Sequence, residues 1–441
     1  MVFLPHFPIS SARAISSDSA QKLRPILAKL GNPQNNIPPI IHIAGTNGKG
    51  SVAAFLSSIF QAANYKTHIF TSPHLHHCNE RIKINGQQIS DNYLYELLEE
   101  IRFFTQNIDL TLFEGMFLAA ILAFSKNPAD ICIIETGMGG KVDATNALDN
   151  KIATILTSIS LDHEEFLGNN LPAIAAHKAH IARTKTPCII APQNISAGQI
   201  IDLHCLQIKT SMVHFGQNFT ININENDFDF KYLGDNLTIN YQKLPKPNLI
   251  GRHQYLNASL AIAAICAIKD LQKTNFNIDQ KAAEEGLKKA FMPSRLQKLN
   301  YRKLKAKDEL FIDGAHNFGG FSSLALWLKE KMVEDYEKKE IKRNYLIVGF
   351  SKNKSKPEIF RLFKDIMDFI CPVMVEGEPD PEETGNIAKN IAAAQIEQFK
   401  TKENLDDALN FLINLDQKNP CRIIICGSFY LARDFRKLSN Q

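Results

Sequence analysis

The sequence lacks the features that would place the protein in a membrane or outside the cell. No apolar run approaches the roughly 20 residues that a membrane-spanning helix needs, and residues 1–10 contain no basic segment followed by a long apolar one. The eight cysteines show no metal-ligand spacing, since Cys421 and Cys426 are too far apart for a C-x-x-C pair. Cys132 and Cys266 lie in apolar runs. We therefore expect a cytoplasmic protein with reduced, buried thiols and no membrane partner.

The sequence also has little net charge for its length. Its 50 Lys and Arg residues and 46 Asp and Glu residues leave a net charge of +4 over 441 residues, and both signs are spread along the chain. A nucleic-acid-binding protein usually carries a basic patch or stripe, so we expect no nucleic-acid partner. The small positive balance suits small polyanionic substrates. The length indicates two or three domains.

Short apolar runs alternate with segments of helical spacing through much of the chain. Strands are expected at residues 40–44, 66–71, 131–135, 152–157 and 188–191. Helices are expected at residues 51–63 and 255–270. This alternation is typical of a mainly parallel sheet covered by helices on both faces.

Two features divide the rest of the chain. Residues 210–241 are rich in Phe, Ile, Thr and Asn, alternate in polarity and contain turn signals such as Gly234-Asp235-Asn236, which predicts a small antiparallel β appendage. A second α/β unit is expected to begin within 292–299. Its expected strands lie at 310–313, 345–348, 369–375 and 422–426, with a helix at 321–333. We therefore predict an α/β protein with a P-loop-type domain over 1–295 and a Rossmann-like domain over 296–441.

A glycine-rich turn follows the first expected strand and precedes the first expected helix. Glycines let backbone N–H groups approach phosphate oxygens, and a helix N-terminus favours anions. Lys49 is expected to contact the terminal phosphates, and Ser51 to support magnesium–phosphate geometry. Gly50 separates these two residues, so the loop departs from the strict P-loop pattern, and an ordinary glycine-rich turn is the alternative. The predicted ATP-binding loop comprises Gly45, Thr46, Asn47, Gly48, Lys49, Gly50 and Ser51.

This loop and several later motifs resemble the folylpolyglutamate synthase and dihydrofolate synthase family of the Mur ligase superfamily. The motifs are His42-Ile43-Ala44 with the loop, Thr71-Ser72-Pro73-His74-Leu75, Glu80-Arg81-Ile82, Glu135-Thr136-Gly137-Met138-Gly139-Gly140, Asp143-Ala144-Thr145-Asn146, Leu161-Asp162-His163, Asp313-Gly314-Ala315-His316-Asn317 and Gly427-Ser428. They extend over nearly the whole chain. The resemblance implies a two-domain, ATP- and Mg²⁺-dependent ligase that joins L-glutamate to dihydropteroate or a reduced folate through an acyl phosphate. We expect it to act as a monomer.

The resemblance also implies the residues that hold magnesium and assist phosphoryl transfer. Ser72, Glu135 and His163 match the magnesium ligands of the family, and each lies at or just after an expected strand end. Taken alone, Glu135 could be a solvated strand end and His163 a loop histidine bonded to the backbone. Lys178 matches a catalytic lysine carried as a carbamate, which can support a second magnesium ion. Relatives usually have Glu where this chain has His177, and a solvated helical lysine is the alternative.

Four further residues are implied to contact substrates. Asn257 matches an adenine contact, with a helix-capping residue as the alternative. Arg295 matches an interdomain arginine that reaches an ATP phosphate. Asp313 is implied to hold the ribose hydroxyls, and His316 to lie near the γ-phosphate or the incoming glutamate as a catalytic residue. The alternative for these two is a polar turn in which Asp313 caps backbone N–H groups. The proline that usually follows Asn317 in the family is replaced by Phe318.

Two other functions are alternatives. Cell-wall Mur ligases carry a whole domain before the phosphate loop, whereas fewer than about fifty residues precede it here. A non-catalytic nucleotide-binding protein on the same fold is the second alternative, although Lys49, Glu135, His163, Asp313 and His316 are retained. The sequence leaves open whether the ligase makes dihydrofolate, extends polyglutamate chains, or does both.

Overall fold

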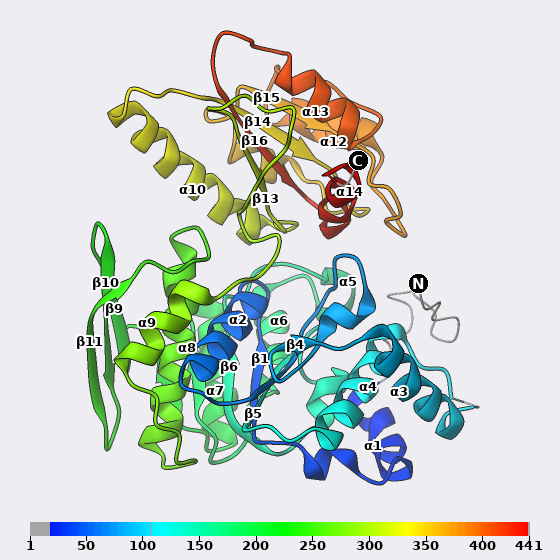
Figure 1. The fold of residues 1–441 in the computed structure, drawn as a ribbon, viewed down its shortest axis with the longest axis vertical. Helices are drawn as coiled ribbons and strands as arrows, with labels where there is room; N and C mark the ends of the chain where they lie inside the picture. The colour runs from blue at the N-terminus through cyan, green and yellow to red at the C-terminus, as the bar shows by residue number, and fades with distance from the viewer. Residues whose placement is uncertain (1–17, 107, 440–441) are drawn as a thin grey trace. The chain divides into compact units, whose positions relative to one another are not determined.

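The computed structural model describes residues 18–106 and 108–439, so residues 1–10, on which the expectation about a leader segment rests, lie outside the described residues. The chain divides into two compact units. The first extends to Asn248 and continues over Gln254–Phe291, and the second comprises Leu249–His253 and the chain from Met292 onward. Figure 1 shows that each unit is built from a sheet with helices around it.

The first unit is organised around an eight-stranded sheet with the order β4-β3-β2-β5-β1-β6-β7-β8. Its strands are β1 Ile40–Ala44, β2 Thr67–Phe70, β3 Ile82–Ile84, β4 Gln87–Gln88, β5 Ile131–Glu135, β6 Lys151–Leu156, β7 Cys188–Ile190 and β8 Met212–His214. The six neighbouring strands β2-β5-β1-β6-β7-β8 pair in parallel. Strand β3 pairs antiparallel with β2, and β4 pairs antiparallel with β3 at the edge of the sheet. Five of these strands match the expected ones. The assignment of Met212–His214 to the appendage is wrong, because these residues pair in parallel with β7.

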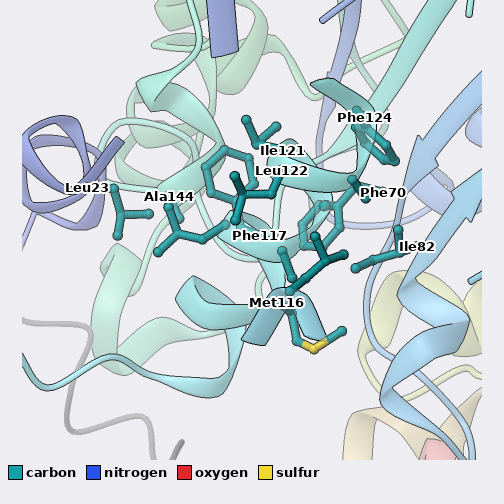
Figure 2. Packing of buried hydrophobic residues seen from close by; sticks show 14 of the residues in the cluster. Leu23, Phe70, Ile82, Met116, Phe117, Ile121, Leu122, Phe124 and Ala144 are labelled. Atoms are coloured by element: carbon teal, nitrogen blue, oxygen red, sulfur yellow. The ribbon is translucent and has the colours of Figure 1, made fainter. Parts of the chain in front are cut away.

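Helices cover both faces of this sheet. They are α1 Ser19–Lys29, α2 Lys49–Ala62, α3 Asp91–Phe104, α4 Leu112–Lys126, α5 Glu164–Leu167, α6 Leu171–Ala179, α7 Ile195–Gln207, α8 His253–Asp270 and α9 Gln280–Lys289. Successive residues of β5 point to opposite faces, yet all five are buried. Figure 2 shows one of the resulting clusters, in which Leu23 of α1, Phe117 of α4, Phe70 of β2 and Ile82 of β3 pack together. Both faces are therefore core, as a parallel sheet requires.

A separate antiparallel sheet follows β8, as expected. It consists of β9 Phe219–Ile223, β10 Asp227–Leu233 and β11 Thr238–Pro245. Phe228, Phe230 and Tyr232 alternate along β10 and are buried, which explains the period-two pattern. The Asp270 carboxylate at the end of α8 accepts hydrogen bonds from the N–H groups of Asp235 and Asn236, at 3.1 and 2.8 Å, and so ties the last hairpin to the helix.

The second unit is a five-stranded sheet with the order β12-β13-β16-β14-β15. Its strands are β12 Gln297–Leu299, β13 Glu309–Ile312, β14 Arg343–Val348, β15 Phe369–Pro372 and β16 Cys421–Cys426. Its helices are α10 Phe318–Glu337, α11 Pro357–Arg361, α12 Thr384–Ala393, α13 Leu405–Ile413 and α14 Phe429–Ser439. The four expected strands pair in parallel, while β12 is an unexpected antiparallel edge. Since β16 lies between β13 and β14, the chain segments that follow β13 and β16 emerge side by side at one edge.

Within 18–106 and 108–439, no helix combines the length and the apolar character that crossing a membrane requires.

Candidate active site

The glycine-rich loop directly follows β1 and is held by the chain after β6. Gly45 has φ of 147°, and a Cβ placed there would lie 1.8 Å from the Thr157 hydroxyl oxygen, so no side chain fits. The Thr46 N–H donates to the Ser158 carbonyl at 2.9 Å. The Thr46 hydroxyl donates to the Ser160 carbonyl and accepts from the Ser160 N–H, both at 3.1 Å. The loop is therefore fixed by its backbone.

Helix α2 begins within this loop. Gly48 adopts φ of 94° as the residue before the helix, so Lys49 and Gly50 already belong to the first turn, two residues earlier than predicted. The first N–H groups of a helix have no partner inside it, and the helix dipole makes this end attractive to anions. A Cβ at Gly48 would lie 2.5 Å from Asn257 Oδ1, so the Asn257 amide packs directly on the loop. Asn257 is inside α8 rather than at its cap.

Lys49 lies between the loop and a buried carboxylate. Its Nζ donates to the carbonyl oxygens of Gly45 and Thr46, at 3.1 and 3.2 Å, and lies 4.0 Å from Glu135 Oε1. Glu135 ends β5 and is only 2% exposed. Its Oε2 accepts a hydrogen bond from the Ser72 N–H at 3.3 Å. The parallel neighbours β2 and β5 thus bring Ser72 and Glu135 together, as their positions after strand ends predict.

His163 follows β6 and immediately precedes α5. It has φ of 51°, its N–H donates to Asp162 Oδ1 at 2.9 Å, and its Nε2 lies 3.9 Å from Asp162 Oδ2. Within the described part of the chain, no three His, Cys, Asp or Glu side chains are grouped so that they could hold a metal ion. The predicted set of Ser72, Glu135 and His163 contains only two residues of those types. Its role in metal binding stays a prediction.

Lys178 is buried, with 4% of its surface exposed, which rules out the alternative of a solvated helical lysine. It lies on α6, and its Nζ donates to the Gly45 carbonyl at 2.8 Å. Burial, and then the charge of Lys49, lower the pKa of Lys178 to about 7, although the carboxylates of Asp162 and Asp143 act in the opposite direction. A neutral amine is therefore accessible near neutral pH.

Sequence reasoning missed a buried polar chain next to this lysine. The hydroxyl of Thr145 donates to Asp143 Oδ1 at 2.5 Å, so it must accept from Nε2–H of His42 at 2.8 Å. Asp143 Oδ2 accepts from the Met138 N–H at 2.8 Å. Burial raises the pKa of Asp143 despite these bonds. The chain fixes the Gly-rich segment after Glu135. All three polar residues lie in quoted motifs, but the contact between His42 and Thr145 links residues 103 positions apart.

In the second unit, Asp313 organises the turn that carries Arg295. Asp313 Oδ2 accepts from the Leu296 N–H and Oδ1 from the Ala315 N–H, both at 2.8 Å. Ser294 and Leu296, on either side of the arginine, have φ of 57° and 45°. Burial raises the pKa of Asp313, and Arg295 opposes the increase. These bonds match the backbone-capping alternative, so contact with ribose stays a prediction.

His316 lies just after Asp313. Its Nδ1 is 2.8 Å from the Gly314 carbonyl, which can only accept, so Nδ1 carries a proton. In the neutral ring Nε2 is therefore the basic atom. His253, by contrast, is buried beside Arg295, and burial followed by the arginine charge lowers the pKa of His253 to about 4. The structure thus brings Arg295, Asp313 and His316 together within the second unit, with His253 as a neutral neighbour that the sequence did not single out as a site residue.

Comparison with known proteins identifies the family. Residues 43–265 match the Mur ligase middle domain, and residues 297–438 match the C-terminal domain of dihydrofolate synthetase. The Bacillus subtilis dihydrofolate synthase/folylpolyglutamate synthase is 30% identical over 94% of each chain. The chain belongs to the dihydrofolate synthase/folylpolyglutamate synthase family.

Solved structures of this family share the fold. The Mycobacterium tuberculosis folylpolyglutamate synthase, complexed with ADP and AMPPCP, is 27% identical, covers 96% of each chain and superposes with a TM-score of 0.83. A bifunctional enzyme of this family from Yersinia pestis, complexed with AMPPNP and a Mn ion, has a TM-score of 0.80 at 23% identity, with 96% of this chain and 93% of that chain covered. The predicted α/β fold and the predicted class, an ATP-dependent ligase of the folate family, are therefore confirmed.

Proposed function

We propose that the protein ligates L-glutamate to the carboxylate of dihydropteroate, of a reduced folate, or of both, with ATP as phosphoryl donor and Mg²⁺ as the metal. The observation that most supports this proposal is the convergence of Lys49 and Lys178 on the Gly45 carbonyl, beside the buried Glu135 carboxylate. Lys49, in the first turn of α2, suits the terminal phosphates of a nucleotide.

The reaction consists of two displacements. A carboxylate oxygen of the acceptor bonds to the γ-phosphorus of ATP while the bond to the β–γ bridging oxygen breaks, giving an acyl phosphate and ADP. The amine nitrogen of glutamate then bonds to the acyl carbon, phosphate leaves and the nitrogen loses a proton. The protein must hold anions together and neutralise charge as the phosphoryl group moves.

The first unit supplies the phosphate-binding groups in this proposal. The loop residues direct backbone N–H groups at the phosphates, and Lys49 exchanges its two carbonyl partners for phosphate oxygens. Asn257, packed on Gly48, is placed to meet the adenine of a nucleotide bound by this loop.

The metal site is proposed at Ser72, Glu135 and His163. Hydroxyl, carboxylate and imidazole donors suit Mg²⁺ or Mn²⁺. The buried carboxylate of Glu135 lies 4.0 Å from the Lys49 ammonium group, and its negative charge also favours a bound metal cation. When bound, the metal ion neutralises charge on the phosphates.

Lys178 is proposed to carry a carbamate. Its low pKa supplies the neutral amine that adds to CO₂, and the product loses one proton to give an anion that can support a second metal ion. Mass spectrometry of protein equilibrated with ¹³CO₂ and trapped by alkylation tests this step. A Lys178 peptide without the label would contradict it.

In the second unit, Arg295 is proposed to contact a phosphate, Asp313 the ribose, and His316 the acyl phosphate or the glutamate amine. We keep 1–295 as the proposed ATP-binding domain and 296–441 as the proposed ligase domain, although the main segment of the second compact unit already begins at Met292 and so includes Arg295. We further propose that the protein acts as a monomer in the cytoplasm.

Phosphate release tests the function and separates the two acceptors. Purified protein is assayed with ATP, Mg²⁺ and glutamate, and with either dihydropteroate or tetrahydrofolate. We expect release that requires glutamate and at least one acceptor, with the product one glutamate heavier by mass spectrometry. A match to the C-terminal domain of dihydrofolate synthetase favours a folate-type acceptor over a cell-wall precursor. Phosphate release that is independent of both acceptors would contradict the proposal.

A further inference from the structure

Phe429 begins α14, three residues after β16 ends at Cys426. Two backbone hydrogen bonds fix the intervening turn beside the end of β13. The Asp313 N–H donates to the Ile425 carbonyl at 2.9 Å, and the Gly427 N–H donates to the Ala315 carbonyl at 2.8 Å. The position of the Phe429 ring is therefore set by the sheet, not by a mobile surface loop.

The Phe429 ring contacts two proposed site residues at once. Arg295 Cζ lies over the ring at 5.2 Å from its centroid. The His316 ring centroid is 5.7 Å away, with an angle of 51° between the ring planes. A Cβ at Gly314 would lie 2.6 Å from the Phe429 ring and 3.0 Å from Arg295 Nη1. Only glycine at position 314 leaves the space in which the ring and the guanidinium meet.

No described residue holds Arg295 by a hydrogen bond or an ion pair, and its buried Nε has no partner. Asp313, whose charge acts on Arg295, uses both carboxylate oxygens on the backbone N–H groups of Leu296 and Ala315. A guanidinium has five N–H donors in one plane. An arginine held by the face of an aromatic ring keeps those donors for an anion, whereas a carboxylate partner would occupy them.

We propose that Phe429 is a positioning residue, whose ring holds the Arg295 guanidinium over its face with the N–H donors turned to a nucleotide phosphate, and which packs against the His316 ring. This inference rests on the proposed function, in which Arg295 contacts the phosphate. Without the ring, Arg295 explores more rotamers, and binding must then offset the cost of ordering it.

The first test compares a substitution that removes the ring with one that keeps it. Phe429→Leu retains an apolar side chain without a ring, and Phe429→Tyr retains the ring. We expect Phe429→Leu to weaken the affinity for AMPPNP about 2- to 30-fold, the range spanned by a cation–π contact. Phe429→Tyr is expected to bind AMPPNP nearly as tightly as the wild type. Phe429→Met serves as a second ring-free variant if Phe429→Leu folds poorly.

A double-mutant cycle shows whether Phe429 acts through Arg295. In an Arg295→Ala background, Phe429→Leu is expected to cause no further loss of AMPPNP affinity, because the group it positions is gone. The matched control is Phe411→Leu on α13 of the same unit. It also removes a cation–π contact, since Lys402 Nζ lies 3.9 Å from the Phe411 ring centroid. That substitution is expected to change thermal unfolding without changing nucleotide affinity.

The outcomes separate this inference from the proposed function. Independent, additive losses in the double variant would show that Phe429 does not act through Arg295 and would overturn the inference. Equal affinity of wild type, Phe429→Leu and Phe429→Met would do the same. If the wild type itself releases no glutamate-dependent phosphate, the proposed function fails instead. AMPPNP binding is measured directly, so the cycle can still be read in that case.

Discussion

Lys49 and Lys178 donate hydrogen bonds to the same acceptor, the carbonyl oxygen of Gly45, at 3.1 and 2.8 Å. Two ammonium groups on one carbonyl repel each other, and this repulsion contributes to the low pKa of Lys178. This repulsion is removed when the Lys178 amine is neutral or becomes an anionic carbamate. It is reduced when phosphates bind beside Lys49. If Lys49 binds nucleotide phosphates as proposed, this pair links nucleotide binding to the protonation state of Lys178.

Lys49→Ala is expected to lower kcat/KM at least about 100-fold, the scale of removing one preorganised donor from a developing charge. The loop should remain folded, because Thr46 is held by Ser158 and Ser160, and Gly45 by Lys178, through hydrogen bonds that do not involve Lys49. Steady-state phosphate release and circular dichroism check both parts. Lys29→Ala, an exposed lysine on α1, is the matched control. Near-normal turnover of Lys49→Ala at saturating ATP would remove the assigned role.

Glu135→Gln keeps the shape of the side chain but removes its negative charge. If Glu135 holds the metal, the Mg²⁺ concentration for half-maximal activity should rise at least about tenfold. A magnesium titration at fixed ATP measures this shift, with Glu96→Gln, an exposed residue on α3, as control. An unchanged titration curve would contradict the assignment of Glu135 as a ligand.

The lowered pKa of Lys178 predicts how the free energy of unfolding depends on pH. Its pKa is about 7 in the folded protein, and the ordinary value is 10.5. Between these values the unfolded chain binds more protons, so the free energy of unfolding should rise with pH, by at most about 1.4 kcal/mol per pH unit from this residue. Below about pH 7 the contribution is constant. Lys178→Met should remove this slope.

Chemical denaturation of both proteins at pH 7.5, 8.5 and 9.5, in buffers free of bicarbonate, measures the effect. The advantage of Lys178→Met over the wild type should shrink as the pH rises. Lys151 is also buried with a lowered pKa, but it is present in both proteins and cancels in the difference. A difference that stays constant across this range would show that Lys178 is charged in the folded state.

The parts of the fold that the sequence predicted are those with strong local signals. Continuous apolar runs at β1 and β5, bounded by polar turns, identify buried parallel strands without any tertiary information. Strands β3, β4, β8 and β12 were missed or misplaced because each is only two or three residues long and lies at or near a sheet edge. Too few alternating residues are available there to show a period.

The candidate site shows the same limit. The loop and the strand-end residues could be predicted, since each lies in a short motif of consecutive residues that can be recognised in the sequence. The partners of Thr145 and Arg295 could not, because His42 and Phe429 are about a hundred or more positions away and look like ordinary core residues in the sequence. Asp313 shows a further limit of sequence reasoning. Its motif predicts contact with a ribose, whereas in the structure both carboxylate oxygens accept hydrogen bonds from backbone N–H groups.

His316→Ala separates catalysis from nucleotide binding. The Nδ1 of His316 donates to the Gly314 carbonyl, so the ring is oriented with Nε2 as its basic atom. An atom so placed can accept a proton from the glutamate amine or contact the acyl phosphate, whereas we propose that the loop at Gly45 and Lys49 holds the nucleotide. We therefore expect glutamate-dependent turnover to fall about 100-fold or more, within the range of general acid–base catalysis, while AMPPNP affinity changes by less than about threefold.

His316→Asn, which keeps a polar side chain of shorter reach, should resemble His316→Ala in turnover, because an amide nitrogen is not basic. Both quantities are measured on the same protein preparations, so a folding defect would lower them together. His214→Ala in β8 is the matched control, since His214 pairs with Asp202 in the first unit and is not among the proposed site residues. If turnover survives in His316→Ala, or if affinity and turnover fall by the same factor, His316 acts in nucleotide binding or in folding and not in the transfer to glutamate.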